Sequence, residues 1–264
     1  MSNFEEEYIK NDSTDHEPDE HEMTFIDHLE ELRWRVVKAV IGLVVAVSVC
    51  AYFSDWIVNV VILRPRRLTN PPLELINTVP YGQITFYMMV VIFSGLILSM
   101  PWILYQVWKF IQPGLMPRER KYISGIVAFT SVCFLTGVAF AYFVMLPYML
   151  QFFASFGTTD IHNMISVDEY MGFVLQLVLV SGLIFELPMV AYFLALLGIL
   201  TPAFMRHYRR HAVVVILVFA AVITPTTDPV TMMVFSVPIL LLYEISIWIA
   251  GVAIRKRFAN KANK

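Results

Sequence analysis

Apolar residues are gathered along this chain into long runs, and most charged residues lie in the segments between the runs. A helix needs about 20 apolar residues to cross a hydrocarbon core of about 30 Å, and six runs approach or exceed that length. The six predicted spans are roughly 34–54, 84–104, 122–147, 169–199, 211–225 and 230–254. The pattern predicts an all-α polytopic membrane protein, and no internal repeat is visible.

Several predicted helices carry recognisable start signals. Thr24 with Asp27, and Ser166 with Glu169, have the spacing of a capping box, in which side chains satisfy otherwise unpaired backbone N–H groups. Prolines suited to a first helical turn are Pro117, Pro202 and Pro229.

Two of the six spans have unusual lengths. Span four would be about 46 Å long at 1.5 Å per residue, so it must tilt, kink or protrude, and Pro188 is the expected kink. Span five would reach only about 22 Å, which is shorter than the hydrocarbon core. A span this short either thins the bilayer around it or is sheltered by partners.

The charge is unevenly distributed along the chain. Residues 1–22 carry a net charge of −8 and the rest of the chain +6, although the whole is near neutral at −2. We therefore divide the chain into an acidic, disordered tail (1–22), a membrane domain (23–254) and a short basic tail (255–264). The acidic tail has no apolar core or cleavage site, so it does not read as a signal peptide.

Cationic residues indicate the orientation. With six spans, sixteen Lys and Arg residues fall on the side of the two termini, and three fall on the other side, within the segment RPRR at 64–67. Cytoplasmic loops of membrane proteins are rich in Lys and Arg, so both termini are predicted to be cytoplasmic.

The segment TFIDHLEELRWR (24–35) places carboxylates next to the first span, where membrane proteins usually carry cations. Apolar residues recur in it at helical spacing, which predicts a helix lying at the membrane interface. Glu30 and Glu31 fall on its other faces, near Arg33 and Arg35. They are either ordinary intrahelical charge partners, each worth tenths of a kcal/mol, or ligands for an external cation.

The second cytoplasmic segment, 105–122, is rich in aromatic residues and holds one acid, Glu119. Its aromatics, Phe110 among them, are typical of residues at a membrane surface. The alternative is functional, with Glu119 presented on a loop ordered by Pro113 and Pro117.

Two acids lie inside predicted spans, Glu186 in span four and Glu244 in span six. A carboxylate facing lipid is costly, so both are expected to face protein or a wet cavity. For each, a functional role competes with simple bridging between helices.

The sequence offers little for catalysis or for metal binding. It has no HExxH, GxSxG or P-loop motif, and no nucleic-acid-binding motif. Cys50 and Cys133 lie in apolar runs, and the pair His207 and His211 has no third ligand nearby in the sequence. We predict a protein that is not an enzyme and has no cofactor and no metal.

Five stretches of the sequence together resemble the TatC family, over roughly residues 24–252. They are FIDHLEELRWR, SMPWILYQVWKFIQPGLMPRERK, GVAFAYFVMLP, FELPMV and ITPTTDPVTMMVFSVPILLLYEISI. These motifs occur in the family's order between the expected spans. The resemblance implies a six-span subunit of the twin-arginine translocase in the cell inner membrane. Such subunits bind twin-arginine signal peptides of folded proteins, whose export is driven by the proton-motive force.

The resemblance also assigns the signal-peptide site. Matching motifs place its two acids at Glu31 and Glu119, and an adjacent aromatic residue at Phe110. An arginine presents a planar fork of donors that a carboxylate accepts in a bidentate manner, and lysine cannot reproduce that geometry. On this hypothesis the acids beside span one bind cations that the peptide supplies.

Further implications of the resemblance concern shape and partners. Glu186 would lie on the concave face of a glove-like helix assembly, open to a wet cavity. The end formed by spans five and six would bind single-span TatA-type and TatB-type subunits, within a complex holding several copies of this chain and membrane lipid. Pro65 and Asp228 match positions that we interpret as structural. Met232 occupies a position where relatives carry a polar Gln. This difference weakens the hypothesis that a polar cluster including Thr224 binds the partner subunit.

Two other functions compete with the receptor. An ion-coupled secondary transporter would use Glu186 and Glu244 as proton carriers, and it would be expected to show inverted repeats, which the sequence lacks. An intramembrane hydrolase would need a nucleophile and base pair that the sequence does not show.

Overall fold

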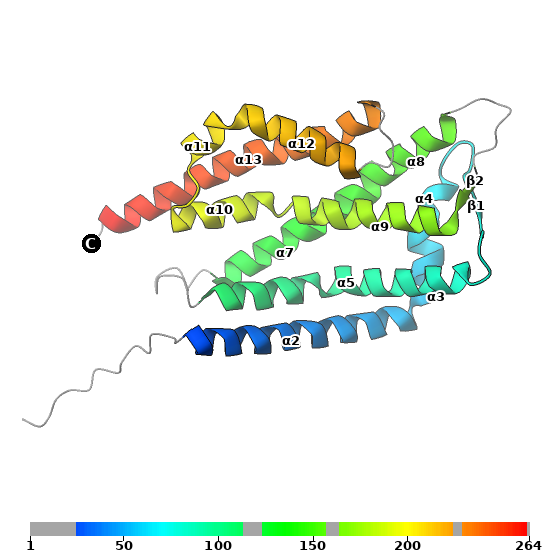
Figure 1. Ribbon diagram of the computed structural model, residues 1–264, viewed down its shortest axis with the longest axis horizontal. Helices are drawn as coiled ribbons and strands as arrows, with labels where there is room; N and C mark the ends of the chain where they lie inside the picture. Colours follow the sequence, from blue (N-terminus) through cyan, green and yellow to red (C-terminus); the bar gives the residue numbers. More distant parts are fainter. Residues whose placement is uncertain (1–24, 113–122, 157–163, 224–228, 263–264) are drawn as a thin grey trace, which may run out of the picture.

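The computed structural model describes residues 25–112, 123–156, 164–223 and 229–262. Its elements are α2 (Phe25–Tyr52), α3 (Ser54–Trp56), the π-helix η1 (Ile57–Ile62), α4 (Arg64–Arg67), β1 (Glu74–Ile76), α5 (Gly82–Ile111), α7 (Ile123–Phe140), the π-helix η3 (Ala141–Met145), α8 (Leu146–Ser155), β2 (Met164–Ser166), α9 (Val167–Ile184), α10 (Leu187–Leu197), α11 (Pro202–His207), α12 (Arg209–Ile223) and α13 (Pro229–Ala262). Long helices run side by side along the molecule, with α7 and α8 crossing them obliquely (Figure 1).

Five helical stretches are long and apolar enough to cross a membrane. They are His28–Tyr52, Gly82–Ile111, Gly125–Ser155, Val167–Leu197 and Pro229–Arg255. The expected short fifth span is α12, which has 15 residues and so reaches about 22 Å. The structure thus confirms an all-helical architecture with five long apolar helices, and it confirms that α12 is short.

The predicted kink in span four is confirmed as a break between two helices. Helix α9 ends at Ile184 and α10 begins at Leu187, with Pro188 in its first turn. Proline has no N–H for the bond to the residue four positions earlier, and its ring clashes with that residue's carbonyl. For Pro188 that residue is Ile184, the last residue of α9.

Span three extends beyond its predicted end at 147 to Ser155. Residues 141–145 form the π-helix η3, and α8 follows it with Pro147 in its first turn. A π-helical turn is wider than an α-helical one and changes the register of the helix. The helical span therefore continues past Pro147, and the apolar segment that follows forms the rest of α8.

Helices α7 and α9 approach each other at two glycines. A Cβ atom on Gly137 would lie 2.7 Å from the Ser181 carbonyl oxygen and 2.9 Å from the Gly182 Cα atom. The Ser181 hydroxyl donates a hydrogen bond of 3.1 Å to the Gly137 carbonyl. In membranes, small residues let backbones pack closely and gain dispersion contacts, because lipid provides no hydrophobic drive between helices.

At the end of the molecule opposite the start of α2, short elements close the bundle (Figure 1). Strands β1 and β2 pair in parallel, with Leu75 opposite Ile165. The hydroxyl of Tyr170 donates to the Ile62 carbonyl at 2.6 Å, and that of Tyr142 donates to the Val61 carbonyl at 2.8 Å. These bonds anchor η1, which leads into α4, to η3 and α9.

The capping residue of α9 provides a local test of helix stability. Ser166 Oγ accepts a hydrogen bond of 3.2 Å from the Glu169 N–H, as the spacing of these residues predicts. We expect Ser166→Ala to lower the free energy of unfolding by about 1 kcal/mol, because one N–H at the helix start loses its acceptor. Unfolding by SDS in mixed micelles, followed by circular dichroism, measures this change. Ser155→Ala is the control, because Ser155 only donates within the last turn of α8. Equal effects of the two substitutions would contradict the capping role.

Candidate functional site

The candidate site is centred on Glu31, in the second turn of α2. Arg35, one turn further along, donates to Glu31 Oε1 from Nη2 at 2.8 Å and from Nε at 3.3 Å. Both side chains are mostly buried, each with 22% of its surface exposed. The second oxygen, Oε2, is buried and has no hydrogen-bond partner among the described residues. The intrahelical ion pair therefore exists, but it leaves one carboxylate oxygen free to accept a donor.

Helix α5 completes the site with two side chains one turn apart. The Gln106 amide oxygen accepts a hydrogen bond of 3.5 Å from Arg35 Nη1, so Arg35 links the two helices. Phe110 stacks on His28 of α2, with ring centroids 4.4 Å apart and an interplanar angle of 18°. On α2, His28, Glu31 and Arg35 are three and four residues apart, which places them on one face of the helix. The site is thus a carboxylate bordered by a cation and by a stacked ring pair.

Sequence analysis identified Glu31 and Phe110, and the structure brings them to the same pair of helices. It did not identify His28, Arg35 or Gln106 as members of the site. The spacing of three and four residues from Glu31 is a signal that could have found the first two. Gln106 is 71 positions away from Arg35 in the chain, so its role becomes visible only when α2 and α5 pack together.

The amphipathic segment before span one differs from the prediction. Helix α2 begins at Phe25 and continues without interruption to Tyr52, so the segment forms its first turns and not a separate interfacial helix. Its apolar residues Leu29 and Leu32 are exposed. The continuity has a simple cause, because no proline or glycine interrupts residues 25–41.

Glu119, Thr224 and Asp228 lie outside the described residues, as do Thr24, Pro113 and Pro117. A second carboxylate beside Glu31 therefore stays a prediction. Pro65, which we interpreted as structural, is buried in the first turn of α4. Met232 packs against the main apolar core of the bundle.

Glu186 lies at the break between α9 and α10. Its side chain is buried, with 8% of the residue exposed, and Oε1 has no hydrogen-bond partner among the described residues. The carboxyl group lies beside Cys133 and Phe134 of α7. Glu186 therefore faces the α7–α9 contact, whereas the contacts of Glu31 come from α2 and α5.

Glu244 has a cationic partner that the sequence did not reveal. Arg209, the first residue of α12, donates a hydrogen bond to Glu244 Oε2 of α13, and both side chains are about half exposed. Glu244, which we expected to face protein or a wet cavity, thus forms an ion pair between the surfaces of two helices. The reason is the shortness of α12, which brings its first residue level with the middle of α13.

The Arg209–Glu244 pair is expected to couple the two helices only weakly. Both side chains are about half exposed, and Arg209 begins α12 on the side predicted to be cytoplasmic, where water and ions reach the pair and screen it. We therefore expect a coupling energy of about 1 kcal/mol or less. A double-mutant cycle on unfolding, with Arg209→Met, Glu244→Gln and the double variant, measures this energy. A coupling energy of several kcal/mol would contradict the description of a screened surface pair.

Metal binding has no visible basis in the described residues, where no three His, Cys, Asp or Glu side chains are grouped closely enough to hold an ion. Cys50 and Cys133 are free thiols.

Comparison with known proteins decides the family. The family profile of the Sec-independent protein translocase protein (TatC) matches residues 27–238. The chain therefore belongs to the TatC family. TatC of Koribacter versatilis is 35% identical over 231 residues, covering 86% of this chain and 85% of its own. TatC of Aquifex aeolicus is 34% identical over 237 residues, covering 89% of this chain and 98% of its own.

The fold comparison agrees. A crystal structure of the twin arginine translocase receptor TatC superposes with a TM-score of 0.75 at 34% identity, covering 86% of this chain and 99% of that one. The resemblance to TatC found in the sequence is thereby confirmed, as is the prediction of a multi-pass membrane protein. Membership of TatC also makes this chain a transport protein and not an enzyme.

Proposed function

We propose that this TatC chain is the subunit of the twin-arginine translocase that binds twin-arginine signal peptides of folded proteins. Family membership and the likeness to a solved TatC receptor support this proposal. The observation that carries it is Glu31 Oε2, a buried carboxylate oxygen without a hydrogen-bond partner among the described residues. Burying such an oxygen is costly unless a donor reaches it, and a peptide guanidinium is such a donor.

In the proposed recognition, an arginine of the signal peptide would bind Glu31 while the ion pair between Glu31 and Arg35 stays in place. Arg35 holds Oε1 and fixes the carboxylate, and Oε2, which has no hydrogen-bond partner among the described residues, would accept from the incoming arginine. Phe110 and its stacking partner His28 provide flat rings on which a guanidinium can lie. Glu119 would take the second arginine, so that each carboxylate binds one guanidinium.

The membrane arrangement follows from the same proposal. The start of α2 and the end of α13 lie at one end of the molecule, which supports termini on a single, cytoplasmic side (Figure 1). Helix α12 would be the fifth and shortest of the six crossings of a glove-like assembly. TatA-type and TatB-type subunits would bind at the end formed by α12 and α13, where a short helix leaves the bilayer mismatched. Export would draw on the proton-motive force, and the complex would hold several copies of this chain.

The competing transporter hypothesis has little support. Of its two proton carriers, Glu244 is engaged by Arg209 on the surface of α12. Glu186 is buried at the contact between α7 and α9, with 8% of the residue exposed, which does not agree with the expectation of a carboxyl group open to a wet cavity.

Complementation tests the proposed function. In a bacterium whose own TatC is deleted, expression of this chain together with TatA-type and TatB-type subunits should restore export of a folded reporter that carries a twin-arginine signal peptide. The matched control reporter carries two lysines in place of the arginines and should stay inside. Equal export of both reporters would contradict the proposal.

A further inference from the structure

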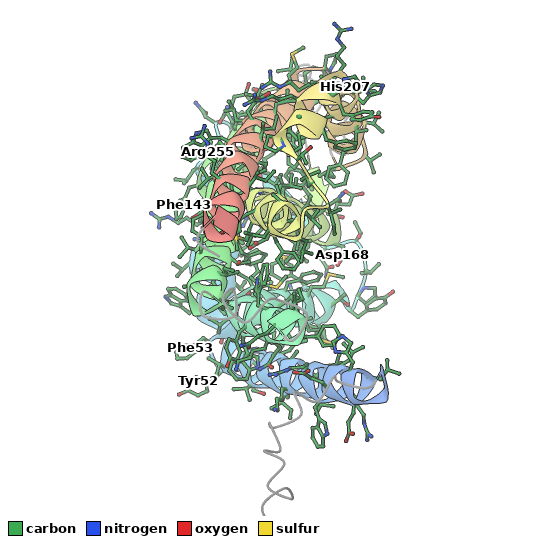
Figure 2. The ribbon with its side chains drawn as sticks, turned by 90° about the vertical axis from the view of Figure 1, so that its left-hand side faces the viewer. Tyr52, Phe53, Phe143, Asp168, His207 and Arg255 are labelled. Carbon is green, nitrogen blue, oxygen red and sulfur yellow. The ribbon has the colours of Figure 1, made fainter. Side chains whose placement is uncertain are left out.

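An apolar groove of about 1040 Å³ opens on one side of the bundle, between α2, η1, α5, α7 and α9. Aliphatic and aromatic side chains make up nearly all of its lining. Two of them, Phe53 and Phe143, are exposed and project from the same side of the molecule (Figure 2). The groove therefore opens laterally, on a face of the bundle that a surrounding bilayer would cover.

Most of the groove lies at membrane depth. Its lining includes Val49 of α2, Ile97 of α5, Leu135 of α7 and Val178 of α9, which belong to four of the five long apolar stretches. From there the groove continues to α4, at the end of the bundle opposite the two described ends of the chain (Figure 1). It thus connects hydrocarbon depth with the predicted outer surface of the membrane.

A cation stands at that outer end. Among the described residues that line the groove, Arg64 alone carries a charge. It is exposed, and neither a hydrogen bond nor an ion pair joins it to the described part of the chain. Arg66 and Arg67 follow on the same short helix, and Arg66 donates from Nη1 to the Leu73 carbonyl at 3.0 Å. An apolar groove with an unpaired guanidinium at its mouth matches an amphiphile with an anionic head.

We propose that the groove is a binding site for an anionic glycerophospholipid, with an acyl chain in the groove and the phosphate on Arg64. A guanidinium binds phosphate oxygens in a bidentate manner. The lining suits an acyl chain of one leaflet, because it is almost wholly aliphatic and aromatic and because the one charged residue among its described members, Arg64, stands at the end predicted to lie at the level of the lipid head groups. Because bulk lipid is as apolar as the groove, the head group decides which lipid is retained.

Native mass spectrometry tests this site. The protein is reconstituted in bilayers of equal parts phosphatidylglycerol and phosphatidylethanolamine, released in mild detergent, and its retained lipids are identified by mass. The wild type should retain one phosphatidylglycerol. Arg64→Gln should lower that retention about fivefold, since one arginine near a membrane surface is worth about 1 kcal/mol toward anionic lipid. Leu135→Trp, at an exposed position of the groove, should reduce retention of either lipid by filling the space.

Arg67→Gln is the matched control, because Arg67 is an exposed cation of the same helix that does not line the groove. Equal retention by Arg64→Gln and Arg67→Gln, or a wild type that emerges free of lipid, would overturn the proposal. A photoreactive benzophenone at Phe143 identifies the occupant in intact membranes. Cross-links to phospholipid support the site, and cross-links to a polypeptide without lipid overturn it.

Discussion

Replacing Gly137 by alanine is expected to lower the free energy of unfolding by about 2–3 kcal/mol, although alanine is the better helix former. The added methyl group would lie 2.7 Å from the Ser181 carbonyl oxygen and 2.8 Å from the Phe185 Cβ atom. Neither neighbour is the flexible end of a side chain, so the new methyl group is accommodated only if α7 and α9 separate. Separation would also break the hydrogen bond from Ser181 to the Gly137 carbonyl.

Gly125→Ala provides the matched control for this substitution. Gly125 lies on the same helix, and a Cβ atom there would have no neighbour within 4 Å. It should leave the free energy of unfolding unchanged or raise it by up to about 1 kcal/mol, because glycine is the poorer helix former. SDS titration in mixed micelles, followed by circular dichroism, measures both variants. If Gly137→Ala were as stable as Gly125→Ala, the close contact of α7 and α9 would be wrong.

Glu31→Ala is expected to weaken binding of a twin-arginine signal peptide by about 10- to 100-fold. The physical reason is the loss of a hydrogen bond to a charged group, worth about 1.5–3 kcal/mol. The substitution also leaves Arg35 mostly buried without its partner, and its unpaired charge then repels the incoming guanidinium. Fluorescence anisotropy of a labelled peptide, titrated with the purified protein in nanodiscs, measures the change in Kd.

Glu30→Ala is the control for peptide binding. Glu30 is the neighbouring acid on α2 and is exposed. Its replacement by alanine changes the net charge of the protein by the same amount as Glu31→Ala. We expect Glu30→Ala to alter the Kd less than about threefold at physiological salt, where exposed charges are largely screened. If the two variants lost affinity equally, general attraction by negative charge, and not the Glu31 site, would explain binding.

Several features of the fold could be predicted because their causes are local. Pro188 ends α9 at Ile184 through its own ring and its missing N–H, so the break could be predicted without knowing any neighbouring helix. The cap at Ser166 and the shortness of α12 follow in the same way from a few consecutive residues. Membrane spans are also readable, since a bilayer requires a minimum length of apolar helix.

Other features depend on packing between distant segments and could not be predicted. The pairing of β1 with β2 joins residues about 90 positions apart, and each strand has only three residues. The Arg209–Glu244 pair depends on how far α12 reaches along α13. The end of span three was missed because η3 lets the helix continue past Pro147.

Only part of the candidate site could be predicted, because several of its contacts join segments that are distant in the sequence. Glu31 and Phe110 were identified through resemblance to a family, and their positions on facing helices agree with a shared site. The links through Arg35 to Gln106, and through His28 to Phe110, join α2 to α5, and no single stretch of sequence contains them.

The most direct test of the central claim is a double-mutant cycle between peptide and protein. The Kd is measured in nanodiscs for the twin-arginine peptide and for peptides with lysine at the first or the second arginine, each against wild type and Glu31→Ala. We predict that wild type disfavours lysine at both positions, and that Glu31→Ala loses this discrimination at one position only. Discrimination at both positions that survives Glu31→Ala unchanged would contradict the claim that Glu31 binds a signal-peptide arginine.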